Sequence, residues 1–355
     1  MTSRSLHETK PTAACPYCGS KRIIRKGVRR NKYGDVQLFY CPLCKKKFTP
    51  LVNKHKSFPL RVILHAITEY NRLHTLEEAA ATVSRKYGIA VSRQNLKNWL
   101  TAFREYLPIA RLRPAIIERY DRNRAFLECQ LLHGLVYAYK YHRAKTGLIV
   151  ARQHRQSKEH ALFHPLQTFL ENVPRDTPHN LFRDQRARAS THKPRFDLDA
   201  VQITPKDNAA VENARVALQA VANNKLRHEV LQEFMLVNDS VTVAVEVPVT
   251  LTEKDILHFR NTLGYAIPFT LENQGVITGH IDIVQIRNGM IHILDYKPNA
   301  KKIKPIEQLT IYALALSRLT GLRLYHFKCA WFDDENYFEF YPRAVVQKSK
   351  TPNNS

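Results

Sequence analysis

The sequence predicts a multidomain protein in which a small cysteine-rich module and a helical module precede a mixed α/β domain. The chain has 355 residues, and at roughly 100–200 residues per domain this length predicts two or three domains. Two CxxC pairs lie near the N-terminus, a helical periodicity follows, and strand-like and helix-like patterns fill the C-terminal part. The predicted segments are 1–56, 57–107, an intermediate Arg- and His-rich region with a linker at 108–200, the α/β domain at 201–345, and a disordered tail at 346–355.

The charge of the chain favours a polyanionic partner. Lys and Arg outnumber Asp and Glu by 55 to 31, which gives a net charge of +24. Residues 1–60 hold 14 of these basic residues against two acids, so this segment carries half of the excess. A concentrated positive charge attracts nucleic acid. We therefore expect DNA as the partner, and RNA stays open as a second substrate.

No run of residues has the length and apolarity of a membrane span, and the N-terminus lacks the apolar core of a signal peptide. We expect a soluble, cytoplasmic protein without a membrane partner. Six cysteines are too few for a disulfide framework in so long a chain. The sequence leaves the oligomeric state open, and a homodimer is compatible with it.

The two cysteine pairs predict a structural Zn²⁺ site. Cys15 and Cys18 are separated by 22 residues from Cys41 and Cys44. Two thiolates on one turn can occupy two corners of a tetrahedron, so two such turns complete a Cys₄ shell. The basic residues between the pairs, among them Arg29 and Arg30, could contact phosphates or form a solvated face. The segment resembles the N-terminal zinc ribbon of transposases and related mobile-element proteins, and this resemblance implies DNA contact.

Residues 58–107 predict three consecutive helices in the layout of a helix-turn-helix. Thr75 and Ser92 are suited to cap the second and third helices, and Gly88 ends the second. In such a unit the third helix presents its N-terminal residues to the major groove. The alternative is an ordinary three-helix packing unit. The residues expected to face DNA are Arg93, Gln94, Asn95 and Lys97.

A predicted hairpin carries acidic residues in an otherwise apolar sequence. Asn288–Gly289 is a strong signal for a two-residue turn, because both residues tolerate positive φ. With Arg287 opposite Met290, the same register places Asp282 directly opposite Asp295. Alternation places Lys297 on that face as well. Two carboxylates in direct opposition destabilise a sheet unless a cation lies between them.

Lys297 could supply that cation as a plain buried ion pair. The alternative is a divalent metal ion held by Asp282 and Asp295, with Lys297 beside it. Carboxylate oxygens favour Mg²⁺ or Mn²⁺ over zinc.

This constellation resembles the PD-(D/E)XK nuclease superfamily, and in particular its RecB-like branch. The resemblance is carried by "GHID" (Gly279–Asp282), "DYK" (Asp295–Lys297) and "QLTIY" (Gln308–Tyr312). It implies a restriction-endonuclease-like core, a central mixed sheet flanked by helices, and roles for Gln308 and Tyr312 at the site or on the DNA backbone. "RHEVLQEF" on a preceding long helix resembles the His-containing helix of that branch. The resemblance implies His228 as a metal ligand there. Where that branch usually has a glutamate after the leucine, this chain has Gln232, and the acids of the helix are Glu229, taken as the second ligand, and Glu233 as the alternative.

Glu246, on a predicted strand at 241–249, is placed near the site by the resemblance, and a solvated or structurally paired glutamate is the alternative. The first functional hypothesis is therefore a Mg²⁺- or Mn²⁺-dependent DNA nuclease to which the N-terminal modules deliver DNA. The second is a DNA-binding regulator or mobile-element accessory protein with a non-catalytic nuclease fold. A third hypothesis, a transposase-type catalytic domain within 108–200, is rejected, because its acids show no convincing arrangement on strands and helices.

Overall fold

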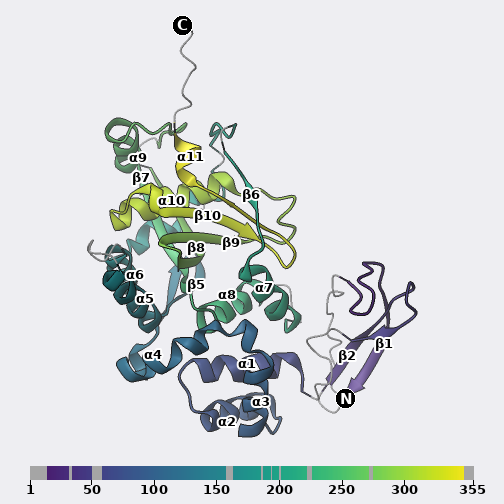
Figure 1. Cartoon of the computed structure of the whole chain (residues 1–355). Helices are drawn as coiled ribbons and strands as arrows, with labels where there is room; N and C mark the ends of the chain where they lie inside the picture. The colour runs from purple at the N-terminus through teal and green to yellow at the C-terminus, as the bar shows by residue number, and fades with distance from the viewer. Residues whose placement is uncertain are drawn as a thin grey trace. The chain divides into compact units, whose positions relative to one another are not determined.

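The chain folds as two compact units, one formed by Met1–Arg113 with Glu212–Asp239 and the other by Pro114–Val211 with Ser240–Ser355. The structure is a computed structural model (Figure 1). Most of the predicted tail at 346–355 lies outside the described residues. The described residues are 14–31, 34–49, 58–156, 163–184, 187–192, 194–199, 201–221, 226–271 and 275–347.

The first unit begins with a small antiparallel sheet of three strands, β1 (Ile24–Asn31), β2 (Gly34–Tyr40) and β3 (Lys47–Phe48). Phe39 and Phe48 are buried beside the cysteines, and their ring centroids lie 5.9 Å apart. So few apolar side chains make a minimal core, and a module of this size needs a further cross-link.

Three helices follow as predicted, α1 (Leu60–Asn71), α2 (Leu76–Tyr87) and α3 (Arg93–Ala102). Thr75 and Ser92 each form a complete capping box with the residue three positions later. Gly88 ends α2 with φ of +63°, a left-handed conformation that glycine adopts without steric cost. The inward faces of α1, α2 and α3 bury apolar side chains against one another.

The same unit contains α7 (Ala209–Gln219) and α8 (Arg227–Asn238), two helices where the sequence predicts one long helix. The N–H of Ala220 donates to the carbonyl of Ala217, a tightened turn that ends α7. The short linking helices of this unit are η2 (Arg104–Tyr106) and η3 (Pro108–Arg111).

Buried polar contacts join α8 to α1. The amide of Asn71 donates to the Asn238 side chain over 2.8 Å, and Asn238 donates to the Thr68 hydroxyl over 3.0 Å. At the margin of this contact, Arg72 donates through two nitrogens to one oxygen of Glu233. Because paired polar groups of this kind have few alternative arrangements, they fix α8 on the helix-turn-helix.

The second unit is built on one eight-stranded sheet with the order β4-β5-β7-β8-β9-β10-β11-β6. β9 and β10 run parallel, and the other neighbouring strands pair antiparallel, so the sheet is mixed as predicted. The strands are β4 (Leu127–His133), β5 (Leu135–Tyr141), β6 (Thr204–Pro205), β7 (Thr242–Thr252), β8 (Val276–Arg287), β9 (Met290–Tyr296), β10 (Phe327–Phe332) and β11 (Tyr337–Phe340).

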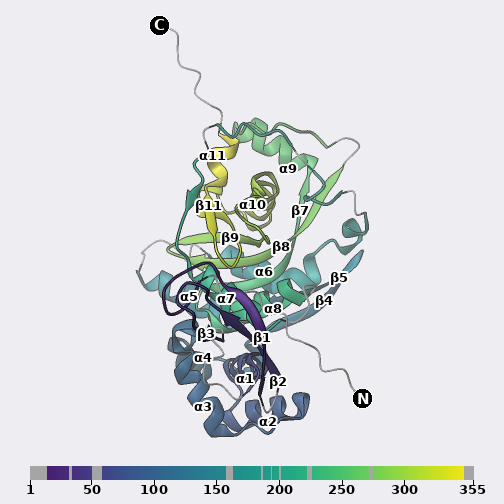
Figure 2. The ribbon, with the colours of Figure 1, turned by 90° about the vertical axis from the view of Figure 1, so that its right-hand side faces the viewer.

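One helix fills the curve of this sheet. The helix α10 (Ile306–Thr320) packs on β7, β9 and β10, and Figure 2 shows the sheet curling around this helix from β7 through β8 to β9. The helix α6 (His164–Asp176) packs on β4, β7 and α10. The remaining helices of the unit are α4 (Arg113–Arg119), η4 (Arg122–Arg124), α5 (Arg143–Gln156), η5 (His179–Arg183), α9 (Glu253–Leu257), η8 (His258–Thr262), η9 (Leu324–His326) and α11 (Pro342–Val346).

Part of the intermediate region extends the sheet. β4 and β5 form a hairpin, and β5 pairs with β7 through Lys140 with Val245 and Tyr141 with Ala244. Tyr139 and Tyr141 are fully buried in the core of this unit. This part of the intermediate region predicted at 108–200 therefore belongs to the second unit.

The predicted hairpin register is confirmed. Arg287 pairs with Met290, and the pairing continues in the same register to Ile283 with Leu294. Asn288 and Gly289 both have positive φ, at 52° and 72°. Within the described part of the chain, no helix combines the length and apolarity that crossing a membrane requires.

Candidate active site

Three acidic residues lie side by side across the middle of the large sheet. The β7–β8 register pairs Val245 with Ile283 and Val247 with Ile281, which puts Glu246 opposite Asp282. The β8–β9 pairing ends at Ile283 with Leu294, and Asp282 and Asp295 are the next residues on the two strands. We call Glu246, Asp282 and Asp295 the acid row.

Glu246 has a backbone conformation that a glutamate rarely adopts. Its φ is +52° in the interior of β7. Such a residue costs of order 1–3 kcal/mol and persists only where its surroundings hold it. Strained residues of this kind cluster at functional sites, and this one stands at one end of the acid row.

We expect Glu246→Gly to be more stable than Glu246→Ala, because glycine adopts positive φ without the steric cost that alanine pays. The expected difference in free energy of unfolding is about 1 kcal/mol, measured by urea denaturation. Equal stabilities of the two variants would show that the backbone at this position is not strained.

Asp295 is the most deeply buried member of the row, at 3% exposure. Its Oδ2 lies 2.9 Å from Nζ of Lys297, which is only partly exposed. Burial raises the pKa of Asp295 well above its usual value, and the neighbouring Asp282 charge raises it further, against the opposing effect of Lys297. Burial alone would lower the pKa of Lys297, but the charges of Asp295 and Asp282 raise it overall, so the ammonium stays protonated.

Asp282 turns from the strand ladder toward Asp295. The last paired residues of β8 and β9 on this side are Ile283 and Leu294. Beyond them, the N–H of Tyr296 donates to Oδ2 of Asp282 over 3.4 Å. The backbone pairing of β8 and β9 therefore stops at the acids, and the Asp282 side chain links the two strands there.

The α10 residues of the predicted motif lie over β8. Gln308 donates through Nε2 to the hydroxyl of Tyr312 over 2.9 Å. A Cβ at position 279 would collide with the ring of Tyr312, so Gly279 is required for this close approach. Burial raises the pKa of Tyr312, and the charges of the acid row raise it further, so this hydroxyl stays neutral.

The row fits a hard divalent cation. Burial and mutual repulsion both oppose ionisation of the Asp282–Asp295 pair, and one lysine balances only one of its charges. A divalent ion held by carboxylate oxygens would balance the remaining negative charge of the pair. Such oxygens are the ligands that Mg²⁺ and Mn²⁺ prefer. Among the described residues, the three carboxylates of the row do not converge within 4.8 Å, unlike the four cysteines. Asp282 and Asp295 interact directly with each other and are the pair suited to the ion, and Glu246 lies opposite Asp282 in the β7–β8 register.

A chain of histidines that was not predicted from the sequence lies beside the row. His133 lies 2.8 Å from His280 and, through its other nitrogen, 2.8 Å from His179. His280 also stacks on Tyr137, with ring centroids 3.6 Å apart. Burial lowers the pKa of His133 to about 4 and that of His280 to about 3. The only sequence signal was His280 within the motif, two residues before Asp282.

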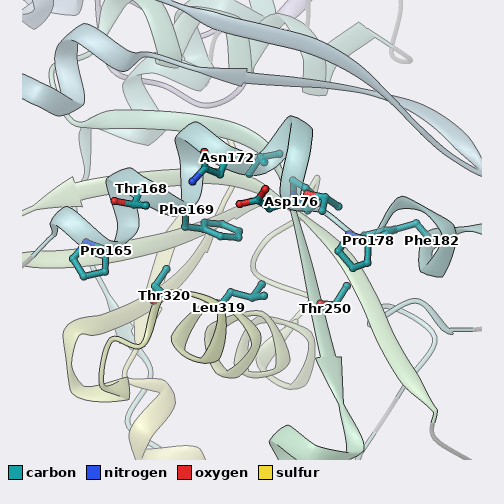
Figure 3. Close-up of a pocket in the computed structure, with 13 residues that line it drawn as sticks. Pro165, Thr168, Phe169, Asn172, Asp176, Pro178, Phe182, Thr250, Leu319 and Thr320 are labelled. Atoms are coloured by element: carbon teal, nitrogen blue, oxygen red, sulfur yellow. The ribbon is translucent and has the colours of Figure 1, made fainter.

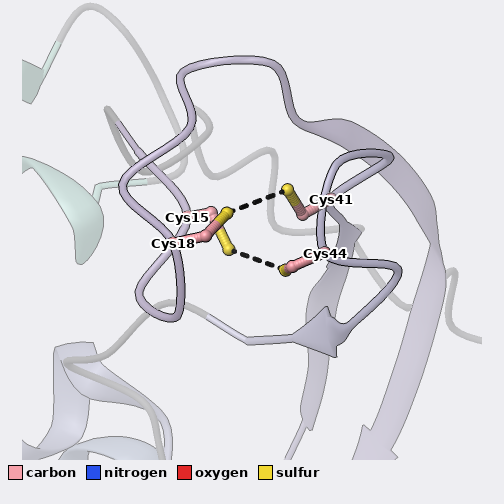
Figure 4. A group of neighbouring side chains, drawn as sticks. All are labelled: Cys15, Cys18, Cys41 and Cys44. Atoms are coloured by element: carbon pink, nitrogen blue, oxygen red, sulfur yellow. Dashed lines mark hydrogen bonds between the residues drawn. The ribbon is translucent and has the colours of Figure 1, made fainter.

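The four predicted cysteine ligands come together. Their Sγ atoms lie within 4.8 Å of one another, with Cys15–Cys44 and Cys18–Cys41 each at 3.6 Å (Figure 4). A tetrahedral zinc with Zn–S bonds of about 2.3 Å places its sulfurs about 3.8 Å apart. The backbone N–H of Cys44 lowers the pKa of Cys41 to about 6, so one thiolate forms readily. The donor set and the spacing of the cluster fit a tetrahedral Zn²⁺ site.

The residues predicted to face DNA are mostly exposed. Arg29 and Arg30 are exposed on β1, and Arg93, Gln94 and Lys97 on α3. Asn95 is only half exposed, because its Oδ1 accepts the Ser92 N–H in the cap of α3. Arg93 pairs over 3.1 Å with Glu77 of α2, and both side chains are largely exposed.

The predicted ligands His228 and Glu229 lie on α8, in the first unit, whereas the acid row belongs to the second. Metal binding by His228 and Glu229 therefore stays a prediction. Glu233, the other acid of that helix turn, is engaged by Arg72.

Comparison with known proteins identifies the second unit. Residues 120–348 match the family model of the PD-(D/E)XK nuclease superfamily, a stretch that contains the whole large sheet. The "Insertion element ISM1 uncharacterized 48.3 kDa protein" of Methanobrevibacter smithii is 32% identical over 100 residues, which cover 24% of this chain and 25% of that protein. The chain thus spans about a quarter of the length of this relative. No solved structure matches.

Proposed function

Because the chain belongs to the PD-(D/E)XK nuclease superfamily, we propose that it is a Mg²⁺- or Mn²⁺-dependent deoxyribonuclease whose N-terminal modules bind DNA. The observation that carries the proposal is the buried carboxylate of Asp295, with the half-buried Asp282 beside it and Nζ of Lys297 at 2.9 Å from its Oδ2. A fold kept only for its shape gains nothing from this arrangement, because a buried carboxylate with a raised pKa lowers stability.

Asp282 and Asp295 would hold the metal, with Glu246 at the edge of the site. When bound, the ion supplies Lewis acidity that activates water at neutral pH and stabilises charge on the phosphate. For phosphodiester hydrolysis the protein has mainly to position the substrate and to stabilise the charge that develops on the phosphate. The remaining residues of the site are suited to both tasks.

Lys297 is suited to stabilise the charge that develops on a phosphate oxygen. Its ammonium is anchored by Asp295 and stays protonated at neutral pH. Tyr312 stays neutral, and its oxygen accepts a hydrogen bond from Gln308, which leaves the hydroxyl proton to be donated to the substrate. Gly279 permits the approach of Tyr312 to β8 and is a positioning residue.

The N-terminal modules supply the charge that DNA binding requires. Half of the net positive charge lies in residues 1–60, and the basic side chains of β1 and α3 are exposed. The relative from Methanobrevibacter smithii is described as an insertion-element protein. We therefore propose that the substrate is DNA handled during the movement of a mobile element.

The test is cleavage of end-labelled single-stranded, duplex and branched DNA, and of the matching RNA, with Mg²⁺ or Mn²⁺. Wild type is expected to cut at least one DNA substrate, and Asp295→Ala and Lys297→Ala are expected to cut none at a comparable rate. If wild type cuts nothing with either ion, or both variants cut as well as wild type, the chain is not a nuclease of this kind. A DNA-binding regulator with a non-catalytic fold would then be the better account.

We expect Arg93→Ala and Lys97→Ala to weaken DNA binding by about 1–3 kcal/mol each if α3 enters the major groove. A lysine that contacts a phosphate also contributes to the salt dependence of binding, so Lys97→Ala should lower the slope of log K against log salt by about 1. Fluorescence anisotropy at several salt concentrations measures both effects. The matched control is Arg85→Ala, an exposed arginine of α2. If Arg85→Ala weakens DNA binding as much as the α3 variants do, α3 is not the recognition helix.

A further inference from the structure

A cavity of about 420 Å³ lies in the second unit (Figure 3). Its size falls within the ~300–1,000 Å³ of ligand pockets in general. Figure 3 shows Phe169 and Asp176 of α6 on one side and Leu319 and Thr320 of α10 on the other. The lining residues are Pro165, Thr168, Phe169, Asn172, Val173, Asp176, Thr177, Pro178, Phe182, Pro248, Thr250, Leu319 and Thr320.

The cavity lies close to the acid row along two separate elements. On β7, Pro248 and Thr250 follow Glu246 by two and four residues, which is roughly 7 and 13 Å at ~3.3 Å per residue. On α10, Leu319 follows Tyr312 by two helical turns, roughly 10 Å at ~1.5 Å per residue. Both distances correspond to roughly two to four nucleotides at the ~3.4 Å rise of a DNA strand.

Side chains continue from the cavity wall to the acid row. Phe182 lines the cavity and stacks on His133, with ring centroids 4.0 Å apart. His133 contacts His280 over 2.8 Å, and His280 lies two residues before Asp282 on β8. A ligand in the cavity would therefore be held by the same packed layer that supports the row.

The chemistry of the lining suits a planar heterocycle. Phe169 offers an aromatic face, and the prolines and Leu319 add apolar walls. Arg175 donates to Oδ1 of Asn172 over 3.0 Å and to Oδ1 of Asp176 over 2.8 Å, and so orients both side chains. The amide nitrogen of Asn172 and the second oxygen of Asp176 then provide one donor and one acceptor. A carboxylate accepts from an exocyclic amino group, as it does from cytosine N4.

We propose that this cavity receives one unstacked nucleobase of the bound DNA strand, two to four nucleotides from the cut, and prefers bases that carry an exocyclic amino group. The identification of the strand as substrate rests on the proposed nuclease function. Enzymes that act on nucleic acid commonly extrude a base into a pocket and stack it on aromatic side chains. Thymine lacks an amino group and would leave Asp176 without a donor.

The lining favours a base on a strand over a free nucleotide. None of the described residues that line the cavity is Lys or Arg. Arg175, which contacts the lining residues Asn172 and Asp176, is already paired with the Asp176 carboxylate. The phosphates of a free nucleotide would find no other cation among the described lining residues, whereas the phosphates of a strand are held elsewhere on this basic protein.

The test uses the full chain without added divalent metal and a single-stranded oligonucleotide that carries one 2-aminopurine and an end label. Anisotropy of the end label reports strand binding, and 2-aminopurine fluorescence reports stacking of that base. Wild type is expected to quench the 2-aminopurine on binding. Phe169→Leu keeps the apolar packing but removes the ring, and should weaken binding through that base roughly tenfold.

Base preference is measured by competition with oligonucleotides that carry adenine, cytosine, guanine or thymine at the same position. Wild type should bind thymine more weakly than the other three, and Asp176→Asn should lose this difference. Asp176 is 57% exposed, so its substitution should leave the fold intact. The matched controls are Asp207→Asn and Tyr325→Ala, two exposed residues outside the cavity, which should behave as wild type.

Equal quenching by wild type and Phe169→Leu, absence of any quenching, or indifference to thymine would overturn the proposal. A free deoxynucleotide that competes as well as the oligonucleotide would instead make the cavity a nucleotide site. The cleavage assay decides the nuclease function separately. If the protein cuts DNA but fails the fluorescence and competition tests, the nuclease function stands and the base pocket is wrong. If the protein quenches 2-aminopurine but cuts no DNA, the base pocket stands and the nuclease function is wrong.

Discussion

Replacing Asp295 by asparagine is expected to lower the rate of DNA cleavage by about 1,000-fold or more. The variant removes a carboxylate that would hold the metal, and a catalytic ion contributes several kcal/mol of charge stabilisation in the transition state, where each 1.4 kcal/mol is tenfold in rate. Asparagine has nearly the same shape, so the loss would come from charge and not from packing. Single-turnover cleavage with Mg²⁺ or Mn²⁺ measures it.

The same variant is expected to stabilise the metal-free protein at neutral pH. Because the folded pKa of Asp295 is raised above its unfolded value of about 3.9, folding takes up a proton. The associated stability is fully present below the unfolded pKa and is lost as pH rises through the folded pKa. The asparagine side chain of the variant does not titrate, so the loss of stability over this window should be smaller there. Urea denaturation across the pH range checks this, and parallel pH profiles would contradict the raised pKa.

Removing zinc is expected to unfold the ribbon of residues 14–49 and to leave the second unit folded. Structural Zn²⁺ contributes about 10–16 kcal/mol of apparent binding free energy in small zinc-binding peptides, so such modules do not fold without it. The buried apolar core of the ribbon consists of Phe39 and Phe48 beside the cysteines, which is too small to replace the ion. Elemental analysis should find one zinc per chain in wild type and none in Cys41→Ser.

Cys129→Ala serves as the control, because Cys129 lies on β4 outside the cluster. It should retain the full zinc content. Limited proteolysis with and without chelator should show cleavage confined to the N-terminal module. A ribbon that resists protease equally well after chelation would contradict a structural zinc site.

The hairpin could be predicted in detail because its determinants are local. Asn288–Gly289 specifies a tight turn, and the turn specifies the register that places Asp282 opposite Asp295. The helix caps at Thr75 and Ser92 were predictable for the same reason, since each depends on residues three positions apart.

The remainder of the site depends on contacts that no local pattern encodes. The positive φ of Glu246 is imposed by the surrounding sheet and is unusual for its residue type. His133 is 147 residues from its partner His280 and 46 from His179. β5 pairs with β7, about 100 residues later in the chain, and a local sequence pattern does not specify which sheet a strand joins.

The packing of α8 could not be predicted from its sequence either. Its sequence resembles the ligand-bearing helix of the RecB-like branch, yet in this chain Glu233 and Asn238 bind residues at the C-terminal end of α1. These partners lie more than 160 residues away in the sequence. A motif resemblance identifies the residues of such a helix but not the surface on which it packs.

The most direct test of the metal site is Mn²⁺ binding at neutral pH, followed by electron paramagnetic resonance for wild type and for the double variant Asp282→Asn, Asp295→Asn. Wild type should bind Mn²⁺ at a site that Mg²⁺ competes for, and the double variant should lose that site while it retains its zinc. If the double variant binds Mn²⁺ with the same stoichiometry and affinity as wild type, the facing aspartates do not hold the ion.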